Sequence, residues 1–289
     1  MSPIEKLDQA HFPALLKEIT DPPKQLYLEG ELPSDELVHL TVVGSRRPSR
    51  YGQEVAEHLV TGLAGQPVAI VSGLAIGLDT IAHNSALKVG LPTIAVPGSG
   101  LDRSVLHPPS NRRLADKIVS SGGALLSELS LTEPAGIHTF PRRNRIMAGL
   151  SQAVLVVEAG ERSGTLITSR LALDYNRDVL AVPGSIFSPT SKGANDLIRQ
   201  GASVIASSGD LLLALGFEPE EKASGQAKLL ELAPPAETVR QLLAVEPLAR
   251  DDLIKCLKLS AQEVIPILAM MELKGLIKEE MGEFRLTGR

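Results

Sequence analysis

Short apolar runs rich in β-branched residues recur through the middle of this chain, and each is followed by turn-forming residues, most of them then leading into a helical pattern. Apolar runs without polar interruption are typical of strands that are buried on both faces of a parallel sheet. Right-handed crossovers through the intervening helices then give a doubly wound, Rossmann-like α/β fold. We expect strands at residues 40–43, 68–71, 93–96, 124–126, 153–158, 179–182 and 204–206.

Composition divides the chain into four parts. Residues 1–38 are proline-rich and weakly periodic, which predicts an N-terminal extension packed on the sheet domain of residues 39–216. Residues 217–235 are polar, rich in breakers and end in two prolines, as a linker does. Residues 236–289 hold three helical patterns and a hairpin signal, which together indicate a small C-terminal winged-helix domain.

The third helical pattern of this small domain, Ser260 to Lys274, falls where a recognition helix would lie. Its polar residues are Gln262, Glu263, Glu272 and Lys274, which is a poor set for facing phosphates. The pattern therefore favours protein contact or packing over DNA binding for this domain.

Composition also narrows the class of protein. The single cysteine, Cys256, excludes an intramolecular disulfide and a multi-cysteine metal site. No apolar stretch is long enough for a membrane span, and the first residues lack a secretory signal, so we expect a cytoplasmic protein with no membrane partner. The histidines and cysteine show no metal-binding spacing, and we expect neither a metal nor a cofactor.

Basic residues are segregated along the sequence although the net charge is −5. Local potential, rather than the net charge, governs the binding of a polyanion. One cluster lies just ahead of the strand at 153–158, and arginine's planar fork suits phosphate oxygens. A solvated surface patch is the alternative interpretation. The basic clusters comprise Arg46 and Arg47, then Arg112 and Arg113, then Arg142, Arg143 and Arg145 with Asn144 between them.

Small residues follow several of the expected strands, where free backbone N–H groups and helix starts can hold anions. Ordinary turns are the alternative for each of them taken alone. Several such turns along one sheet edge suit a polymer of phosphates better than one nucleotide, and 3% aromatic residues without tryptophan favour backbone recognition over base stacking. The residues concerned are Gly44, Ser45, Ser72, Gly73, Gly98, Gly100, Ser163, Gly164 and Thr165, with Arg162 at the start of the last turn.

Four acids near strand or helix ends are candidate supporting residues. Asp79 is expected to cap the helix that carries His83, an ordinary helix histidine, and Asp102 either contacts a nucleotide or caps its own turn. Glu128 and Glu158 suit either general acid/base chemistry or the orientation of arginines, and we favour the second role.

These motifs resemble, in order, those of the DNA-processing protein A (DprA/Smf) family over residues 12–215. The matching stretches are Val-Gly-Ser-Arg at 43–46, Ser-Gly-Leu-Ala-Ile-Gly-Leu-Asp-Thr-Ile-Ala-His at 72–83, Gly-Ser-Gly-Leu-Asp at 98–102, Phe-Pro-Arg-Arg-Asn-Arg-Ile-Met-Ala at 140–148, Glu-Ala-Gly-Glu-Arg-Ser-Gly-Thr-Leu-Ile-Thr at 158–168 and Val-Pro-Gly-Ser at 182–185. A tyrosine-proline step common in the family is His107-Pro108 here.

The resemblance implies a non-enzymatic, dimeric protein that binds single-stranded DNA. Such a protein would load the RecA recombinase onto DNA during natural transformation, when the cell is competent to take up DNA. Arg46 would hold the DNA backbone, and the loop carrying Arg142 to Arg145 would support the same pocket. The alternative is a nucleotide-binding enzyme, because the sheet also resembles that of the lysine-decarboxylase-like phosphoribohydrolases. Their catalytic glutamate is replaced by Thr168 here, which argues against hydrolysis. A third interpretation is a protein-interaction scaffold in which the winged-helix domain is the contact surface.

Overall fold

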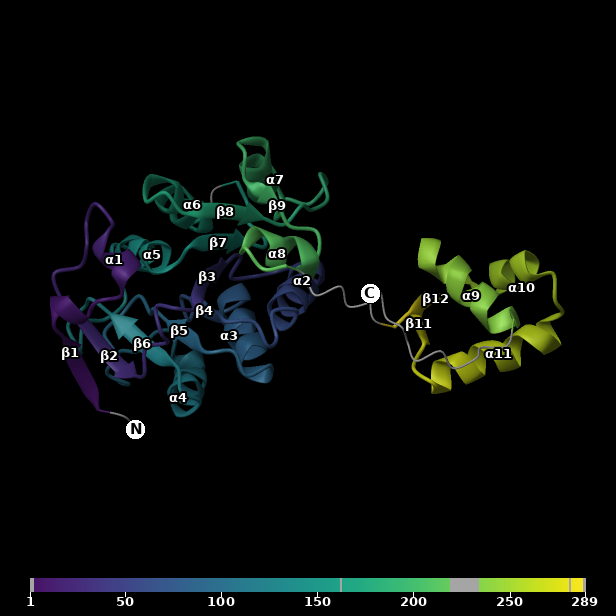
Figure 1. Ribbon diagram of the computed structural model, residues 1–289, viewed down its shortest axis with the longest axis horizontal. Helices are drawn as coiled ribbons and strands as arrows, with labels where there is room; N and C mark the ends of the chain where they lie inside the picture. The colour runs from purple at the N-terminus through teal and green to yellow at the C-terminus, as the bar shows by residue number, and fades with distance from the viewer. Residues whose placement is uncertain (1–2, 162, 219–233, 281, 288–289) are drawn as a thin grey trace. The chain divides into compact units, whose positions relative to one another are not determined.

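A nine-stranded mixed sheet organises the larger of the two compact units into which the chain divides, residues 1–219 and 220–289 (Figure 1). The computed structural model describes residues 3–161, 163–218, 234–280 and 282–287. The strands are β1 (Ile4–Leu7), β2 (Leu26–Gly30), β3 (Val38–Val43), β4 (Val68–Ser72), β5 (Thr93–Ala95), β6 (Ala124–Ser127), β7 (Ala153–Val156), β8 (Asp178–Ala181) and β9 (Ser203–Val204).

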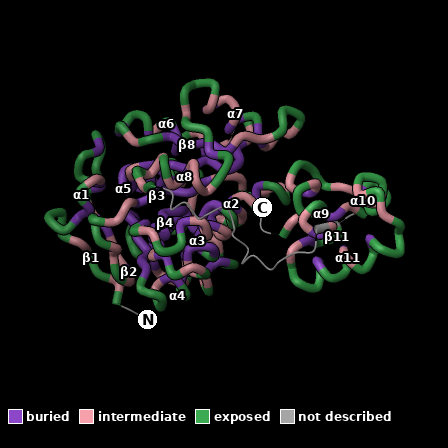
Figure 2. Tube along the Cα trace, turned by 45° about the vertical axis from the view of Figure 1, so that its right-hand side comes forward, coloured by how far each residue is buried: buried purple, intermediate pink, exposed green. Residues whose placement is uncertain are grey.

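The strand order is β1-β2-β6-β5-β4-β3-β7-β8-β9, and β3 to β9 pair in parallel, which confirms the doubly wound Rossmann-like fold. The helices of this unit are α1 (Ala14–Lys17), α2 (Arg50–Thr61), α3 (Leu78–Lys88), α4 (Arg112–Ser120), α5 (Thr139–Leu150), α6 (Thr165–Asp174), α7 (Lys192–Arg199) and α8 (Ser208–Ala214). In Figure 2 the central strands are buried, and exposed residues concentrate on the helices and loops around them.

Both faces of the sheet are covered by apolar helix faces. Residues of α1, α5, α6 and α7 pack against Val43, Val71 and Val156 on one face. Residues of α2, α3 and α8 pack against Leu40 and Ile70 on the other. The uninterrupted apolar strands follow from this double burial, since successive side chains point to opposite faces and each meets a helix.

The N-terminal segment contributes more than the sequence indicated. Strand β2 pairs antiparallel with β6, and β1 pairs antiparallel with β2, so the segment extends the sheet by two strands. The run that forms β2 contains the charged Glu29 and lies between prolines, which hides its strand character. Helix α1 packs closely against α5 at Gly149. A side chain added at Gly149 would bring its Cβ within 2.9 Å of side-chain atoms of Leu16 and Ile19.

The order of strands reverses between β3 and β7. The chain runs outward through β4, β5 and β6, and then returns to place β7 on the other side of β3. Ligands of doubly wound sheets bind at such a switch point, because the loops that leave the two central strands diverge there and open a crevice. The carboxyl ends of β3 and β7 are therefore where a site is expected.

The cluster at Arg142 to Arg145 is helical, not a loop, because it forms the first half of α5. Ile146, Met147 and Leu150 are buried within about two turns beyond Arg143, so this stretch has an apolar side that anchors it to the sheet. Pro141 stands in the first turn, where backbone N–H groups have no intrahelical partner and a proline is tolerated.

The smaller unit has the winged-helix fold that the sequence predicts. It consists of α9 (Pro234–Val245), β10 (Leu248–Ala249), α10 (Arg250–Leu257), α11 (Ala261–Leu273), β11 (Ile277–Glu280) and β12 (Glu283–Leu286). The strands form a sheet in the order β10-β12-β11, and a separate core includes Val239, Leu253, Leu268 and Phe284. Glu263 is engaged in a capping box at the start of α11, where it accepts hydrogen bonds from the Ser260 amide and hydroxyl.

Candidate functional site

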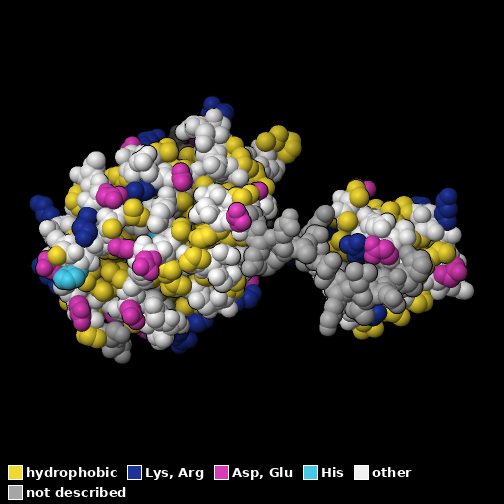
Figure 3. Space-filling model, viewed as in Figure 1, with side chains coloured by type: hydrophobic (Ala, Val, Ile, Leu, Met, Phe, Trp, Pro, Cys, Tyr) yellow, Lys and Arg dark blue, Asp and Glu magenta, His cyan; other side chains and the backbone are white. Residues whose placement is uncertain are grey.

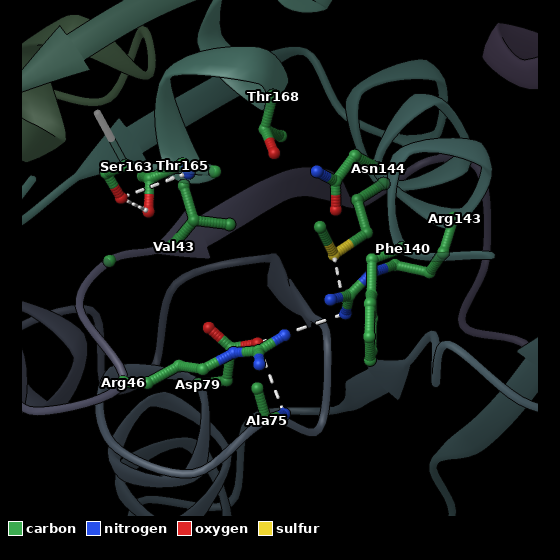
Figure 4. A pocket seen from close by; sticks show the side chains of 13 residues that line it. Val43, Arg46, Ala75, Asp79, Phe140, Arg143, Asn144, Ser163, Thr165 and Thr168 are labelled. Carbon is green, nitrogen blue, oxygen red and sulfur yellow. Dashed lines mark hydrogen bonds and ion pairs between the residues drawn. The ribbon is translucent and has the colours of Figure 1, made fainter. Parts of the chain in front are cut away.

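A cavity of about 310 Å³, here called the main cavity, opens at the carboxyl ends of β3 and β7. Four segments line it: the end of β3 and the turn after it, the turn into α3 with the first turn of that helix, helix α5, and the start of α6 (Figure 4). The lining residues are Val43, Gly44, Arg46, Ala75, Asp79, Phe140, Arg143, Asn144, Met147, Ser163, Gly164, Thr165 and Thr168.

Arg143 supplies a fixed cation at the floor of this cavity. Its side chain is 7% exposed, and its Nη1 donates to the Val96 carbonyl oxygen at 2.9 Å. A Cβ at Gly73 would lie 1.4 Å from that Nη1, so only glycine leaves room for the guanidinium. Burial lowers the pKa of Arg143 from its ordinary value, yet an arginine guanidinium stays protonated in proteins. Its charge is thus held in place by the backbone.

Arg46 supplies a second cation, which is exposed. Its guanidinium lies 4.8 Å from the centre of the Phe140 ring, in a cation–π contact. Phe140 in turn packs over Gly98, where a Cβ would approach the ring to 2.5 Å. The contact directs a long, mobile side chain toward the mouth of the cavity while leaving its N–H groups free to reach an anion.

A second cavity of about 200 Å³ lies against the first and shares Arg46, Ala75, Phe140 and Arg143 with it. Its other lining residues are Gly73, Ile76, Gly98, His107 and Pro108. Both arginines therefore face two adjoining hollows.

Asp79 is the carboxylate of the main cavity. It is 6% exposed, accepts a hydrogen bond from the Ala75 amide, and lies 3.9 Å from Arg143 (Figure 4). Burial raises the pKa of Asp79, and the neighbouring Arg143 opposes that shift. The expected capping role is wrong, since Gly77 is the N-cap of α3 and Asp79 lies in its first turn.

The start of α6 contributes hydroxyl groups. The Ser163 hydroxyl donates to the Thr165 hydroxyl at 2.9 Å and accepts from the Thr165 amide at 3.2 Å. The amides of Leu166 and Ile167 donate to carbonyls within the same turn. The helix therefore presents its positive end and hydroxyls rather than the row of free N–H groups expected from the sequence. Arg162, which precedes this turn, lies outside the described residues.

Arg142 and Arg145 project from α5 toward Glu128, away from the main cavity. Arg145 donates to Glu128 at 2.5 Å and to the Asp21 carbonyl, and Arg142 lies 3.3 Å from Glu128. Glu128 thus holds two arginines in position, in line with the favoured role for that acid. Neither arginine lines the main or the second cavity.

Glu158 does not orient an arginine in the contacts that the structure describes. Its carboxylate accepts hydrogen bonds from the Ser49 amide and hydroxyl, at 2.9 and 2.6 Å, and from the Thr190 hydroxyl at 3.0 Å. It is 1% exposed and ties together the loops that follow β3, β7 and β8. The expected arginine-orienting role of Glu158 is therefore wrong, because neighbouring hydroxyls satisfy it.

Several candidate residues lie outside the two cavities. Ser72 is fully buried and donates to the Val42 carbonyl, and a Cβ at Gly100 would clash with the carbonyl oxygens of Ser130 and Leu131. Asp102 caps its own turn by accepting from the Ser104 amide and hydroxyl. The others are Ser45, Arg47, Arg112 and Arg113. The Ser45 hydroxyl accepts a hydrogen bond from the Arg47 amide, and Arg112 donates to the Ser104 carbonyl.

His83 is a buried histidine that hydrogen-bonds to the Thr93 hydroxyl at 2.8 Å, and burial lowers its pKa to about 3. Among the described residues, no group of three or more His, Cys, Asp or Glu side chains is arranged to hold a metal ion. The helices in that part of the chain also lack the length and hydrophobicity needed to cross a membrane.

Sequence reasoning missed the roles of Phe140, Ala75, Met147 and Thr168 as lining residues, and of His107 and Pro108 beside them. The sequence signal for Phe140 was indirect: Gly98 follows the buried strand β5 at a point where a side chain would collide with the aromatic ring.

Comparison with known proteins places this geometry in a family. The family model described as DNA recombination-mediator protein A matches residues 4–216, and the model described as DprA winged helix domain matches residues 223–283. The chain belongs to the DNA recombination-mediator protein A family. It is 45% identical over 210 residues to protein Smf of Escherichia coli, which covers 73% of this chain and 56% of that protein.

Two solved structures of the family share the fold. DNA processing protein A of Streptococcus pneumoniae superposes with a TM-score of 0.67 at 40% identity, over 73% of this chain and 74% of that one. The Helicobacter pylori protein, whose structure concerns its single-stranded DNA binding mode, superposes with a TM-score of 0.65 at 28% identity, over 74% of this chain and 96% of that one. The family model at residues 4–216 includes every residue that lines the two cavities.

Proposed function

We propose that this chain binds single-stranded DNA through the main cavity and the second cavity, and acts as a recombination mediator. The observation that carries the proposal is the convergence of Arg46 and Arg143 on two adjoining hollows at the switch point of the sheet. Guanidinium groups bind phosphate with charge-assisted, often paired hydrogen bonds. A strand that crosses both hollows would offer successive phosphates to the same two arginines.

Family membership supports single-stranded DNA as the polyanion, since that is the ligand named for the H. pylori relative. On this proposal the protein protects incoming DNA and loads RecA during natural transformation, and it works in the cytoplasm as a homodimer, without a cofactor and without catalysis. On the face seen in Figure 3, basic and acidic side chains are interspersed over the sheet domain, with no continuous basic surface. This favours DNA binding by a local group of arginines over attraction by the surface as a whole.

A nucleotide hydrolase is the second candidate, and Asp79 is the observation that favours it, because a carboxylate does line the main cavity. Two features weigh against it. Thr168, in the place of the acid in the hydrolase motif, offers only a hydroxyl to the cavity. Asp79 already accepts a hydrogen bond from the Ala75 amide and pairs with Arg143 at 3.9 Å, so its oxygens are engaged in structural contacts.

The test is a titration of labelled oligo-dT across a salt series, read by fluorescence anisotropy, with unlabelled duplex and AMP as competitors. We expect tight binding to the single strand, a steep salt slope of about −0.7 per neutralised phosphate, and weak competition by AMP. Release of free base from AMP, or equal competition by AMP, would favour the enzyme instead.

Arg46→Glu identifies the surface. We expect it to lower oligo-dT affinity by about 10-fold or more and to reduce the salt slope by the share of about one phosphate. Arg199→Glu is the matched control, since Arg199 is 75% exposed on α7 and its charge change is the same. Equal behaviour of the two variants would show that the cavities are not the DNA site. RecA loading is tested separately, by RecA assembly on DNA pre-coated with single-strand-binding protein.

A further inference from the structure

The loop that follows β8 carries an exposed apolar tip beside the site. Ile186 is 84% exposed and Phe187 is 90% exposed. Exposing a phenylalanine almost completely forgoes about 1.5–3 kcal/mol of burial free energy, so an aromatic tip on an ordered loop calls for an explanation.

The loop is held firmly at its base. Gly184 exchanges two hydrogen bonds with the Asn195 side chain, its amide donating at 3.1 Å and its carbonyl accepting at 3.0 Å. The Tyr51 hydroxyl donates to the Pro183 carbonyl at 2.7 Å. The Ser188 amide donates to the Ser185 carbonyl at 3.0 Å, which closes the turn around the tip. The phenyl ring is therefore presented by a preorganised turn, which reduces the entropy lost when a ligand binds it.

The position of the loop links it to the main cavity. Strand β8 is the parallel neighbour of β7, so the loops after these two strands leave from the same edge of the sheet. Thr190 of the β8 loop donates to Glu158, which also binds Ser49 in the segment that follows Arg46. The β7 loop then continues from Glu158 to Ser163 and Gly164 in the cavity wall.

We propose that Phe187 is a stacking platform for one base of the strand whose phosphates occupy the main cavity. This inference rests on the proposed function. The main cavity presents two arginines, one carboxylate and several hydroxyls, and Phe140, the one aromatic ring among its lining residues, already contacts Arg46. A base that swings away from the backbone needs an exposed π-face within reach, and stacking on an aromatic ring accepts any base. The platform thus adds affinity without sequence preference.

The test uses the absence of tryptophan from the chain. Phe187→Trp places the only indole of this chain at the tip, and Leu173→Trp, at a residue 58% exposed on α6, is the matched control. We expect oligo-dT to quench the emission of the first variant, and an abasic oligomer of equal length to leave it unchanged. The emission of the control should respond to neither oligomer.

Affinity supplies the second readout. Phe187→Ala and Phe187→Leu should each lower oligo-dT affinity roughly 5- to 100-fold, leave the abasic oligomer unaffected and leave the salt slope unchanged. Phe187→Trp should retain wild-type affinity. Equal oligo-dT affinity of Phe187→Ala and wild type, with no quenching, would overturn the platform and leave the tip as a protein contact. A wild type that binds no oligo-dT at all would instead overturn the proposed function.

Discussion

Helix α5 of the sheet domain and helix α11 of the winged-helix domain were both candidates for facing DNA, and the structure makes them opposites. Helix α5 directs Phe140, Arg143 and Asn144 into a cavity. The exposed side of α11 carries Ile265, Met270 and Leu273, the last of them 90% exposed, and its Glu263 is occupied by the helix cap.

The difference shows that the setting of a charge matters more than the number of charges in a segment. Three arginines stand within four residues of α5, but only Arg143 lines the cavity, because Glu128 holds Arg142 and Arg145 elsewhere. A cation fixed by a backbone carbonyl in a partly enclosed hollow acts on a phosphate more strongly than one in open solvent. No residue of α11 lines any of the described cavities.

Gly73→Ala should have the largest effect, because it displaces the cavity arginine that distinguishes α5 from α11. The new Cβ would overlap Arg143 Nη1, so the guanidinium must leave its bond to Val96. We expect a stability loss of about 1–3 kcal/mol, measured by urea unfolding, together with near-complete loss of oligo-dT binding. Gly209→Ala is the control, since Gly209 lies in α8 with only the Ser207 hydroxyl at 3.5 Å. Wild-type DNA binding by folded Gly73→Ala would exclude Arg143 from the site.

Glu128→Gln separates structural from binding arginines on the same helix. It removes the charge of the nearer of two carboxylates beside Arg145, whose side chain is 14% exposed, and leaves Asp21 at 3.5 Å as the only remaining anion that the structure describes there. We expect about 1–3 kcal/mol lower stability in urea and unchanged oligo-dT affinity. If affinity falls as well while the protein remains folded, Arg142 and Arg145 belong to the DNA surface after all.

The sheet was predictable because each central strand is an apolar run buried on both faces, and the winged-helix elements because their caps and periodicity agree. Strands β1 and β2 were not, since Glu29 interrupts the apolar run of β2 and prolines lie on both sides of it.

The candidate residues that meet at the main cavity are Gly44, Arg46, Asp79, Arg143, Asn144, Ser163, Gly164 and Thr165. The direction in which a helical arginine points depends on acids far away in sequence. Glu128 and Asp21 attract Arg145, and no local pattern around position 145 encodes that contact. Close approaches such as Gly73 to Arg143 likewise arise only once the sheet brings separate loops together.

Asp79→Asn should sharpen the role of charge inside the cavity. Burial raises the pKa of Asp79, so its folded form binds a proton more readily than the unfolded chain does. Protonation of Asp79 removes a negative charge beside the bound phosphate. Oligo-dT affinity should therefore rise as pH falls toward that raised pKa. We expect the asparagine variant to bind a few-fold more tightly at neutral pH and to lose most of this dependence.

The measurement is oligo-dT affinity across a pH series. His107, in the second cavity, has a pKa lowered by burial and by Arg46, and its protonation also strengthens anion binding. His107→Gln in both backgrounds removes that contribution. A pH profile of Asp79→Asn identical to that of wild type would mean that Asp79 stays charged when DNA binds.

Lys274→Glu should have the smallest effect, and it tests the other half of the contrast. Lys274 is the C-cap of α11, is exposed, and undergoes the same charge change as Arg46→Glu. A lysine at a helix C-terminus contributes about 0.3–1 kcal/mol of stability through the helix dipole, so a small loss in urea unfolding is expected. We expect oligo-dT affinity within about 2-fold of wild type, because screened, exposed charge outside a hollow adds little. A loss comparable to that of Arg46→Glu would make α11 a second DNA contact and erase the distinction between the two helices.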